Sequence, residues 1–247
     1  MLPWSRTLLA VWNDLDRPPL RTPLRAGAGW RVEVVPRTAS TNTDVAARAL
    51  AGELPGLVLV AAEQTTGRGR LGRAWMSPPR AGLTFSVLLT APPSPWVPLL
   101  AGVAVARALR EVAGLTPRLK WPNDVLVDGR KIAGILAEVS AGMVVVGVGL
   151  NVSTRLDELP VDRPATSVRL EGGLTDRATL LRGILAALSD RVTPLDYLGL
   201  CDTVGRVVEV HLPDGSVQRG GASAVDDDGR LVVDGVPHAA GDVVHIR

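Results

Sequence analysis

Four Asp-Gly dipeptides separate short apolar runs along the chain, and they limit its fold more than any other feature. Their aspartates are Asp128, Asp214, Asp228 and Asp234. Asp-Gly supplies the positive φ angles of a type I′ turn, so residues 125–127 and 132–138 are expected to form a β-hairpin. From about residue 204 the other three dipeptides punctuate Val-rich runs. This texture predicts a small β-barrel of roughly 45 residues at the end of the chain.

The preceding part of the chain mixes strand and helix patterns. Strands are predicted from Arg31 and over residues 57–62, 83–89 and 143–152. Helices are predicted over residues 44–51, from the proline cluster 92–98 to about residue 112, and over 178–192. We therefore expect an irregular lead-in over 1–30, a larger domain over 31–198 and a β domain over 199–247. A β domain of this size has a marginal core, so it should lean on the larger one.

Composition excludes several classes of protein. Hydrophobic residues make up 46% of the 247, enough for a buried core, and a net charge of +2 gives no general affinity for nucleic acid or membrane. The single Cys201 cannot form an internal disulfide. The longest apolar stretches fall short of the ~18 residues that span a bilayer. Trp4 and Arg6 interrupt the segment where a signal peptide would need continuous apolar residues. A cytoplasmic protein is expected.

Lysine is scarce, which draws attention to the positions that keep it. The chain has 25 Arg but only 2 Lys, and Lys120 and Lys131 fall within one stretch of twelve residues. A drift that replaced Lys by Arg wherever only surface charge mattered would leave Lys where its chemistry is needed. Three of the four asparagines and one of the two glutamines also lie in motif-like segments, namely Asn42, Asn123, Asn151 and Gln64. The alternative is chance clustering with ordinary turn and capping roles.

Residues 67–73, Gly-Arg-Gly-Arg-Leu-Gly-Arg, satisfy the G-x-G-x-x-G pattern. A dinucleotide-binding loop should open a helix and precede an acidic residue by ~20 positions, whereas this loop leads into a predicted strand. A protein kinase would need H-R-D and D-F-G motifs, which the chain lacks. Glycines let the backbone approach an anion, and the three arginines can surround phosphate or carboxylate oxygens. A solvated loop or an RNA-binding tract is the alternative.

The two lysines lie in the segments 119–124, Leu-Lys-Trp-Pro-Asn-Asp, and 129–138, on the flanks of the predicted hairpin. Joining a carboxylate to the α-phosphate of ATP brings two anions together, which repel by about 4 kcal/mol at ~4 Å and an effective dielectric constant of ~20. Lysine, a compact cation on a flexible stem, suits a bridge whose geometry changes, whereas the rigid fork of arginine suits fixed oxygens. Asn123 could hold phosphates, and Asp124 could orient a lysine or contact Mg²⁺.

Four segments together resemble the biotin–protein ligases, the family of bacterial biotin–[acetyl-CoA-carboxylase] ligases. They are residues 40–42 (Ser-Thr-Asn), 64–75, 120–138 and 147–152. The resemblance implies an α+β fold, in which a catalytic domain with a mixed sheet and helices, similar to class II aminoacyl-tRNA synthetases, precedes an SH3-like β-barrel. Only 39 residues precede Ser40, without a helix-turn-helix pattern, so a ligase without a DNA-binding domain is expected.

The resemblance also implies a reaction and a set of site residues. Biotin would attack the α-phosphate of Mg-ATP to give biotinyl-5′-AMP, and a lysine of a biotin carboxyl carrier protein would then take the acyl group. The catalytic roles fall to Lys131, Arg68 and Lys120. The biotin-binding positions are Ser40, Thr41, Asn42, Gln64, Gly67, Arg68, Gly69, Arg70, Lys131 and Gly134. The ATP-binding positions are Arg70, Arg73, Trp75, Lys120, Asn123, Lys131 and Asn151, and Asp124 is the expected metal ligand.

Two other functions stay open. A lipoate–protein ligase performs the same chemistry on another acid, although the polar residues 40–42 and Gln64 favour a hydrogen-bonding ureido ring over an apolar dithiolane. A nucleic-acid-binding module would use the arginine loop and the barrel, but residues 200–247 contain no aromatic residue on which bases could stack. The expected partners are the carrier protein and the two small substrates, without DNA or membrane, and a homodimer is left open.

Overall fold

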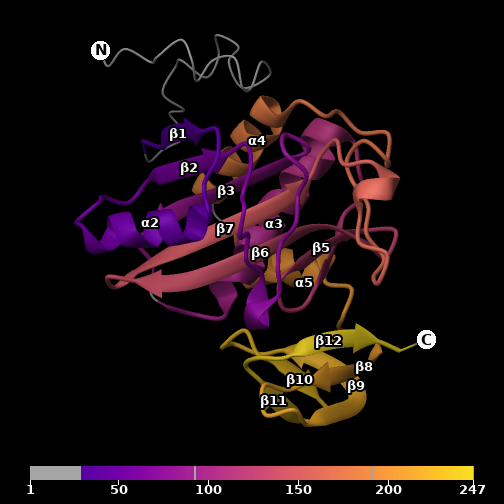
Figure 1. Ribbon diagram of the computed structural model, residues 1–247. Helices are drawn as coiled ribbons and strands as arrows, with labels where there is room; N and C mark the ends of the chain where they lie inside the picture. Colours follow the sequence, from indigo (N-terminus) through magenta and orange to yellow (C-terminus); the bar gives the residue numbers. More distant parts are fainter. Residues whose placement is uncertain (1–28, 92, 191, 247) are drawn as a thin grey trace.

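The computed structural model describes residues 29–91, 93–190 and 192–246, so nearly all of the predicted lead-in over 1–30 lies outside the described residues. Figure 1 shows a large sheet with helices on both faces and a smaller sheet formed by the C-terminal part of the chain. The α+β architecture and the mixed sheet expected from the sequence are confirmed.

Seven strands form the large sheet. Their order is β1 (Arg31–Val35), β2 (Leu57–Ala61), β3 (Gly82–Leu89), β7 (Met143–Asn151), β6 (Arg130–Ser140), β5 (Asp124–Val127) and β4 (Arg118–Lys120). The pair β1–β2 is parallel and the other pairs are antiparallel. Asp128 and Gly129, with φ of 48° and 73°, confirm the tight turn predicted between β5 and β6. The three-residue β4 was not predicted, because nothing in its sequence marks it as a strand.

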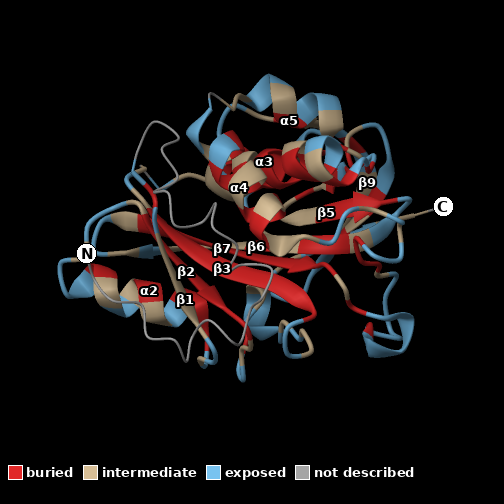
Figure 2. Ribbon diagram, turned by 90° about the horizontal axis from the view of Figure 1, so that it is seen from above, coloured by how far each residue is buried: buried red, intermediate tan, exposed pale blue. Residues whose placement is uncertain are grey.

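Helices cover both faces of this sheet (Figure 2), which explains the nearly continuous apolar runs of its central strands. On one face, α2 (Thr41–Leu50) packs Val45 and Ala49 against β2, β3 and β7. On the other face lie α3 (Trp96–Ala113) and α4 (Arg177–Ser189). Helix α3 begins inside the proline cluster, since Pro98 falls in its first turn, where proline is tolerated. The short α5 (Pro194–Leu200) was not predicted, although the Thr193–Asp196 capping box marks its start.

Five antiparallel strands form the small sheet. Their order is β11 (Val236–His238), β10 (Leu231–Val233), β9 (Val217–Val225), β8 (Val207–His211) and β12 (Asp242–His245). The predicted Asp-Gly positions fall in its turns, with φ of 85° at Gly215, 79° at Gly229 and 81° at Gly235. The domain boundary predicted between residues 198 and 199 falls inside α5, and the division into domains stays a prediction.

Trp121 connects the two sheets. Its side chain is only 1% exposed, its backbone N–H donates to Thr203 Oγ1 at 3.0 Å, and its indole Nε1 donates to the carbonyl of Gly229 at 3.1 Å. Residues of both sheets belong to the same hydrophobic core, which includes Trp121 and Leu231. The small sheet therefore shares a hydrophobic core with the large sheet, as expected for a domain too small to form a stable core alone.

Within the three described ranges, no helix is both long enough and apolar enough to cross a membrane.

The first prediction concerns His245 on β12, which lies 3.2 Å from Thr203 Oγ1. Burial, and then the positive charge of Lys120, lowers the pKa of His245 to about 4. Because an unfolded histidine titrates near 6.5, the unfolded chain binds more protons between these values, and stability should fall as the pH drops from about 6.5 to about 4. His245→Gln should flatten this part of the pH profile of the unfolding free energy, measured with urea.

His211→Gln, at an exposed histidine of the same sheet, is the control and should retain the wild-type profile. An undiminished pH slope in His245→Gln would contradict the assignment.

Candidate functional site

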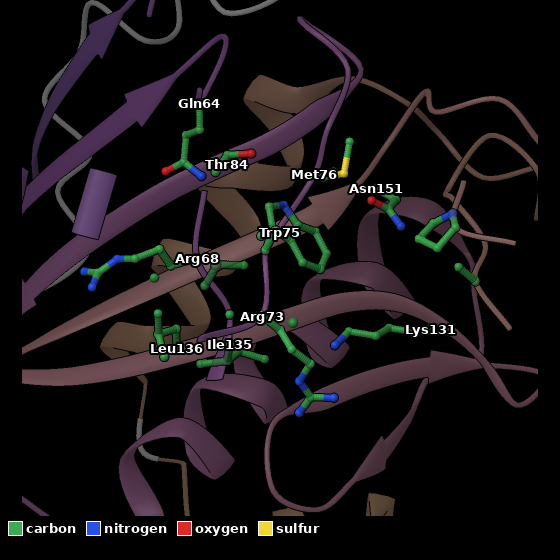
Figure 3. A pocket seen from close by; sticks show the side chains of 18 of the residues that line it. Gln64, Arg68, Arg73, Trp75, Met76, Thr84, Lys131, Ile135, Leu136 and Asn151 are labelled. Carbon is green, nitrogen blue, oxygen red and sulfur yellow. The ribbon is translucent and has the colours of Figure 1, made fainter. Parts of the chain in front are cut away.

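A cavity of about 550 Å³ lies on the α2 face of the large sheet, beside the first turn of that helix. Side chains two residues apart on a strand share a face, so Val145, Gly147, Gly149 and Asn151 of β7 all point to this side. Val145 packs against α2, and the other three line the cavity. Figure 3 shows Trp75 in the middle of the site, with Lys131 pointing towards it and Gln64 and Arg68 farther along.

Glycines of β6 and β7, which have no side chains, form the floor of the cavity. A Cβ atom on Gly147 would lie 2.1 Å from Asn42 Oδ1, and one on Gly149 would lie 2.3 Å from Trp75 Cε2. A Cβ on Gly134 would meet Trp75 and the stem of Lys131 at 3.2–3.3 Å. The space beside Gly134 is thus filled by side chains of the chain itself, and its contact with biotin stays a prediction. The alternating glycines of β7 were the sequence signal for this floor.

Polar side chains gather at the end of the cavity near α2. The backbone N–H and the hydroxyl of Thr41 both donate to Gln64 Oε1, at 2.7 and 2.9 Å, which fixes the orientation of that amide. Ser86 Oγ on β3 lies 2.6 Å from Asn42 Oδ1 and 2.7 Å from Thr41 Oγ1. Ser40 begins α2 and is buried. The sequence analysis did not identify Ser86, because the alternating pattern of residues 83–89 predicts a strand but does not indicate that Ser86 contacts α2.

The glycine-arginine loop, residues 67–75, borders the cavity, and hydrogen bonds between its own backbone groups hold its two ends together. The N–H of Trp75 donates to the Gly67 carbonyl at 2.9 Å, and that of Gly69 donates to the Arg73 carbonyl at 2.6 Å. A short 3₁₀ turn, η2 (Arg70–Gly72), lies between them. A Cβ on Gly67 would come within 2.5 Å of the Trp75 carbonyl, so glycine is needed there for the two segments to cross.

Lys131 projects from β6 into the cavity. Its Nζ lies 2.5 Å from Asp124 Oδ1 and 5.7 Å from the centre of the Trp75 ring. The backbone of Lys131 donates to the Pro164 carbonyl at 3.0 Å and accepts from the Thr166 N–H at 2.9 Å. The segment 154–165, which forms a wall of the cavity, is therefore attached at the same residue. This arrangement presents one oriented cation to a ligand.

Further cations lie where the cavity meets the small sheet. Arg73 makes a two-pronged ion pair with Asp242 of β12, at 2.9 and 3.1 Å. Burial lowers the pKa of Lys120, while Asp124 opposes the shift, and burial followed by the charge of Arg73 lowers the pKa of Arg70. Asp242 was missed because it lies 169 residues from its partner in the sequence.

The two asparagines predicted to contact ATP hold backbone segments of the cavity wall. Asn123 Nδ2 donates to the Ile135 carbonyl at 2.8 Å, and Asn151 Nδ2 donates to the Thr166 carbonyl at 3.0 Å. Two further polar atoms in the wall, Trp75 Nε1 and Thr154 Oγ1, are buried without a hydrogen-bond partner in the described part of the chain. Thr154 was not predicted as a site residue.

Most of the predicted site residues line this one cavity. They are Ser40, Thr41, Asn42, Gln64, Arg68, Gly69, Arg70, Arg73, Trp75, Asn123, Lys131, Gly134 and Asn151. Gly67 and Asp124 lie next to the lining residues Gln64 and Lys131, and Lys120 lies opposite Asp124 on the neighbouring strand β4.

A magnesium ion fits this site only as a companion of phosphates. Among the described residues, no group of three or more His, Cys, Asp and Glu side chains could hold a metal ion. Mg²⁺ bound with phosphates and water needs only one or two protein carboxylates. Asp124 could supply one, although its Oδ1 is already paired with Lys131. Its role as a metal ligand stays a prediction.

The known proteins to which this chain is similar are biotin or lipoate protein ligases. Residues 34–154 match the biotin/lipoate A/B protein ligase family. The biotin–[acetyl-CoA-carboxylase] ligase of Mycobacterium tuberculosis is 42% identical, over 95% of this chain and 99% of that protein. The bifunctional ligase/repressor BirA of Escherichia coli is 33% identical, over 72% of this chain and 58% of that protein. The structure of biotin protein ligase from Aquifex aeolicus with biotin and ATP has a TM-score of 0.70 and 24% identity, and covers 88% of this chain and 99% of that one.

The second prediction concerns the Arg73–Asp242 pair. Asp242→Asn removes the charge that holds Arg73, so amide hydrogen exchange over residues 67–75 should become several-fold faster. Global stability should change by less than about 1 kcal/mol, because both side chains are about two-fifths exposed. Glu209→Gln, which breaks the exposed Glu209–Arg219 pair of the same sheet, should leave the loop unchanged. Equal exchange in both variants would rule out Asp242 as the anchor.

Proposed function

The chain belongs to the biotin–[acetyl-CoA-carboxylase] ligase family, and from this premise we propose how its cavity joins biotin to ATP. The assignment rests on the 42% identity to the Mycobacterium tuberculosis ligase along nearly the whole of both chains. The protein is an ATP-dependent biotin–protein ligase: it converts biotin to biotinyl-5′-AMP and passes the biotinyl group to a lysine. The acceptor that we propose is the biotin carboxyl carrier part of a carboxylase.

In the first step, an oxygen of the biotin carboxylate attacks the α-phosphorus of ATP. The new P–O bond forms as the bond to pyrophosphate breaks, and pyrophosphate leaves with the electron pair. We assign to Lys131 the stabilisation of charge on the carboxylate and the α-phosphate, since its ammonium group lies in the cavity and is oriented by Asp124. A fixed cation needs no reorganisation while the negative charge shifts from one oxygen to another.

In the second step, the neutral amine of the acceptor lysine attacks the acyl carbon of biotinyl-5′-AMP. The amide C–N bond forms, AMP leaves with the electrons of the broken C–O bond, and the amine loses a proton. Arg70 of the loop and Lys120 on β4 are the cations that we propose for the phosphates, and Arg68 is the cation that we propose to hold the biotinyl part of the mixed anhydride. Mg²⁺, held by the phosphates and Asp124, would neutralise the leaving pyrophosphate.

The two substrates occupy different ends of the cavity in this proposal. The polar residues Ser40, Thr41, Asn42 and Gln64 receive the ureido ring of biotin. Trp75, Asn123 and Asn151 lie on the adenylate side, where the indole face offers a stacking surface for a purine. The hydrogen bond from Thr41 to Gln64 supports the first assignment, because it orients an amide at the bottom of the polar end.

Further features complete the proposal. We also propose that the catalytic part is similar to class II aminoacyl-tRNA synthetases and that the small sheet is an SH3-like barrel, which its five antiparallel strands support. A homodimer and a cytoplasmic location stay predictions.

The third prediction tests Lys131. Lys131→Arg keeps the charge but replaces a compact ammonium with a planar fork, so biotin-dependent pyrophosphate release should fall by about 10²–10³-fold while the thermal midpoint stays unchanged. The matched control is Arg130→Lys at the neighbouring position, where the side chain pairs with Glu171 outside the cavity. It should retain activity within about twofold. Near wild-type activity in Lys131→Arg would remove the proposed role.

The fourth prediction concerns the acid that the cavity accepts. Calorimetric titration should show tight binding of biotin and weak binding of lipoate, both with and without Mg-ATP, because a dithiolane leaves the polar groups around Gln64 without partners. The difference should be at least about 100-fold. Tighter binding of lipoate would replace the proposed substrate.

A further inference from the structure

Glu138, near the end of β6, joins two parts of the site through a single oxygen. Its Oε2 accepts a hydrogen bond from Asn42 Nδ2 at 2.7 Å and one from Arg68 Nη2 at 3.3 Å. Asn42 is buried in the first turn of α2, whereas Arg68 belongs to the glycine-arginine loop and its side chain is half exposed. The carboxylate thus connects the fixed floor of the cavity to the loop that borders it.

Both N–H groups of the Asn42 amide are used by internal contacts. Its Nδ2 also lies 3.3 Å from the Leu136 carbonyl, so both of its N–H groups have protein acceptors. Its Oδ1 lies 2.6 Å from Ser86 Oγ, and the side chain rests on Gly147. Asn42 therefore has no remaining N–H to donate to a ligand. Its N–H groups hold Glu138 in a fixed position, and only its Oδ1 can still accept a hydrogen bond from the ureido ring.

Arg68 depends on Glu138 for its position. Gly67 and Gly69 flank it, so the adjacent residues offer no side chain that could restrain it. Its guanidinium contacts Thr43 Oγ1 at 3.2 Å and Glu138 Oε2 at 3.3 Å, and the second contact is charge-assisted. Such a half-exposed pair adds little to global stability. Its effect is to hold one arginine beside the polar end of the cavity.

We propose that Glu138 is a positioning residue that holds Arg68, and with it the loop, over the biotin end of the cavity. This inference rests on the proposed function. Glu138 is not among the residues that line the cavity, so its effect should appear in the KM for biotin and in the retention of biotinyl-5′-AMP. The KM for ATP and the rate of the chemical step do not depend on it.

The test uses Glu138→Gln, in which the amide oxygen can still accept from Asn42 but the charge that attracts Arg68 is lost. The KM for biotin should rise about 5–10-fold, with kcat, the KM for ATP and the thermal midpoint within twofold or 1 °C of wild type. Without acceptor protein, a larger fraction of biotinyl-5′-AMP should escape into solution. The control is Glu33→Gln, which removes one charge from the Glu33–Arg48 pair between β1 and α2 and should change none of these quantities.

An unchanged KM for biotin in Glu138→Gln would overturn the inference. So would an equal rise in both KM values or a lower thermal midpoint, since these indicate a general structural role. Lack of biotin-dependent pyrophosphate release by the wild-type protein would instead contradict the proposed function.

A double-mutant cycle identifies the route of the effect. If Glu138 acts through Arg68, Glu138→Gln should add nothing to the KM for biotin in an Arg68→Gln background. Independent, multiplying effects of the two substitutions would show that Glu138 does not act by holding Arg68.

Discussion

The site depends on one constraint, which is that β7 has glycine at two positions of the face that lines the cavity. Gly147 and Gly149 let Asn42 and Trp75 lie directly on the sheet, at positions that a methyl group would occupy. Two side chains from different parts of the chain therefore pack against the same strand, and both line the cavity. Any larger residue would clash with Asn42 at position 147 and with the indole of Trp75 at position 149, and both side chains would have to move off the sheet. The shape of the cavity therefore follows from atoms that are missing.

Charge is arranged around this floor by carboxylates that come from separate strands. Asp124 of β5 orients Lys131, Glu138 of β6 contacts Arg68, and Asp242 of β12 pairs with Arg73. Each carboxylate leaves its cation beside the cavity while lowering its freedom to move. The site can in this way hold several positive charges close together before an anionic ligand is present. Their mutual repulsion also explains why the pKa of Arg70 is lowered by Arg73 in addition to burial.

The local signals of the sequence predicted much of this arrangement. Asp128-Gly129 indicated a hairpin, and the scarcity of lysine pointed to Lys120 and Lys131, of which Lys131 lines the cavity and Lys120 does not. Residues whose partners lie on other elements were not predictable: Ser86 meets α2, Glu138 meets Asn42, and Asp242 meets Arg73. These contacts depend on strand register and on how the two sheets pack, which neither composition nor short motifs encode. Helix α5 is a different case, because its capping box was visible and its seven residues were too few for a periodic pattern.

The pairing of Arg73 with Asp242 also sets an order in time. Synthesis proceeds from the N-terminus, and the residues of the polar end, from Ser40 to Ser86, are all joined before β8 begins. The partner of Arg73 comes 169 residues after it, in the last strand of the small sheet. In a nascent chain, all residues of the end that we assign to biotin are thus present well before Asp242 can pair with Arg73 of the loop. Until β12 is synthesised, Arg73 lacks the carboxylate that pairs with it, whereas Arg68 already has its partner in Glu138.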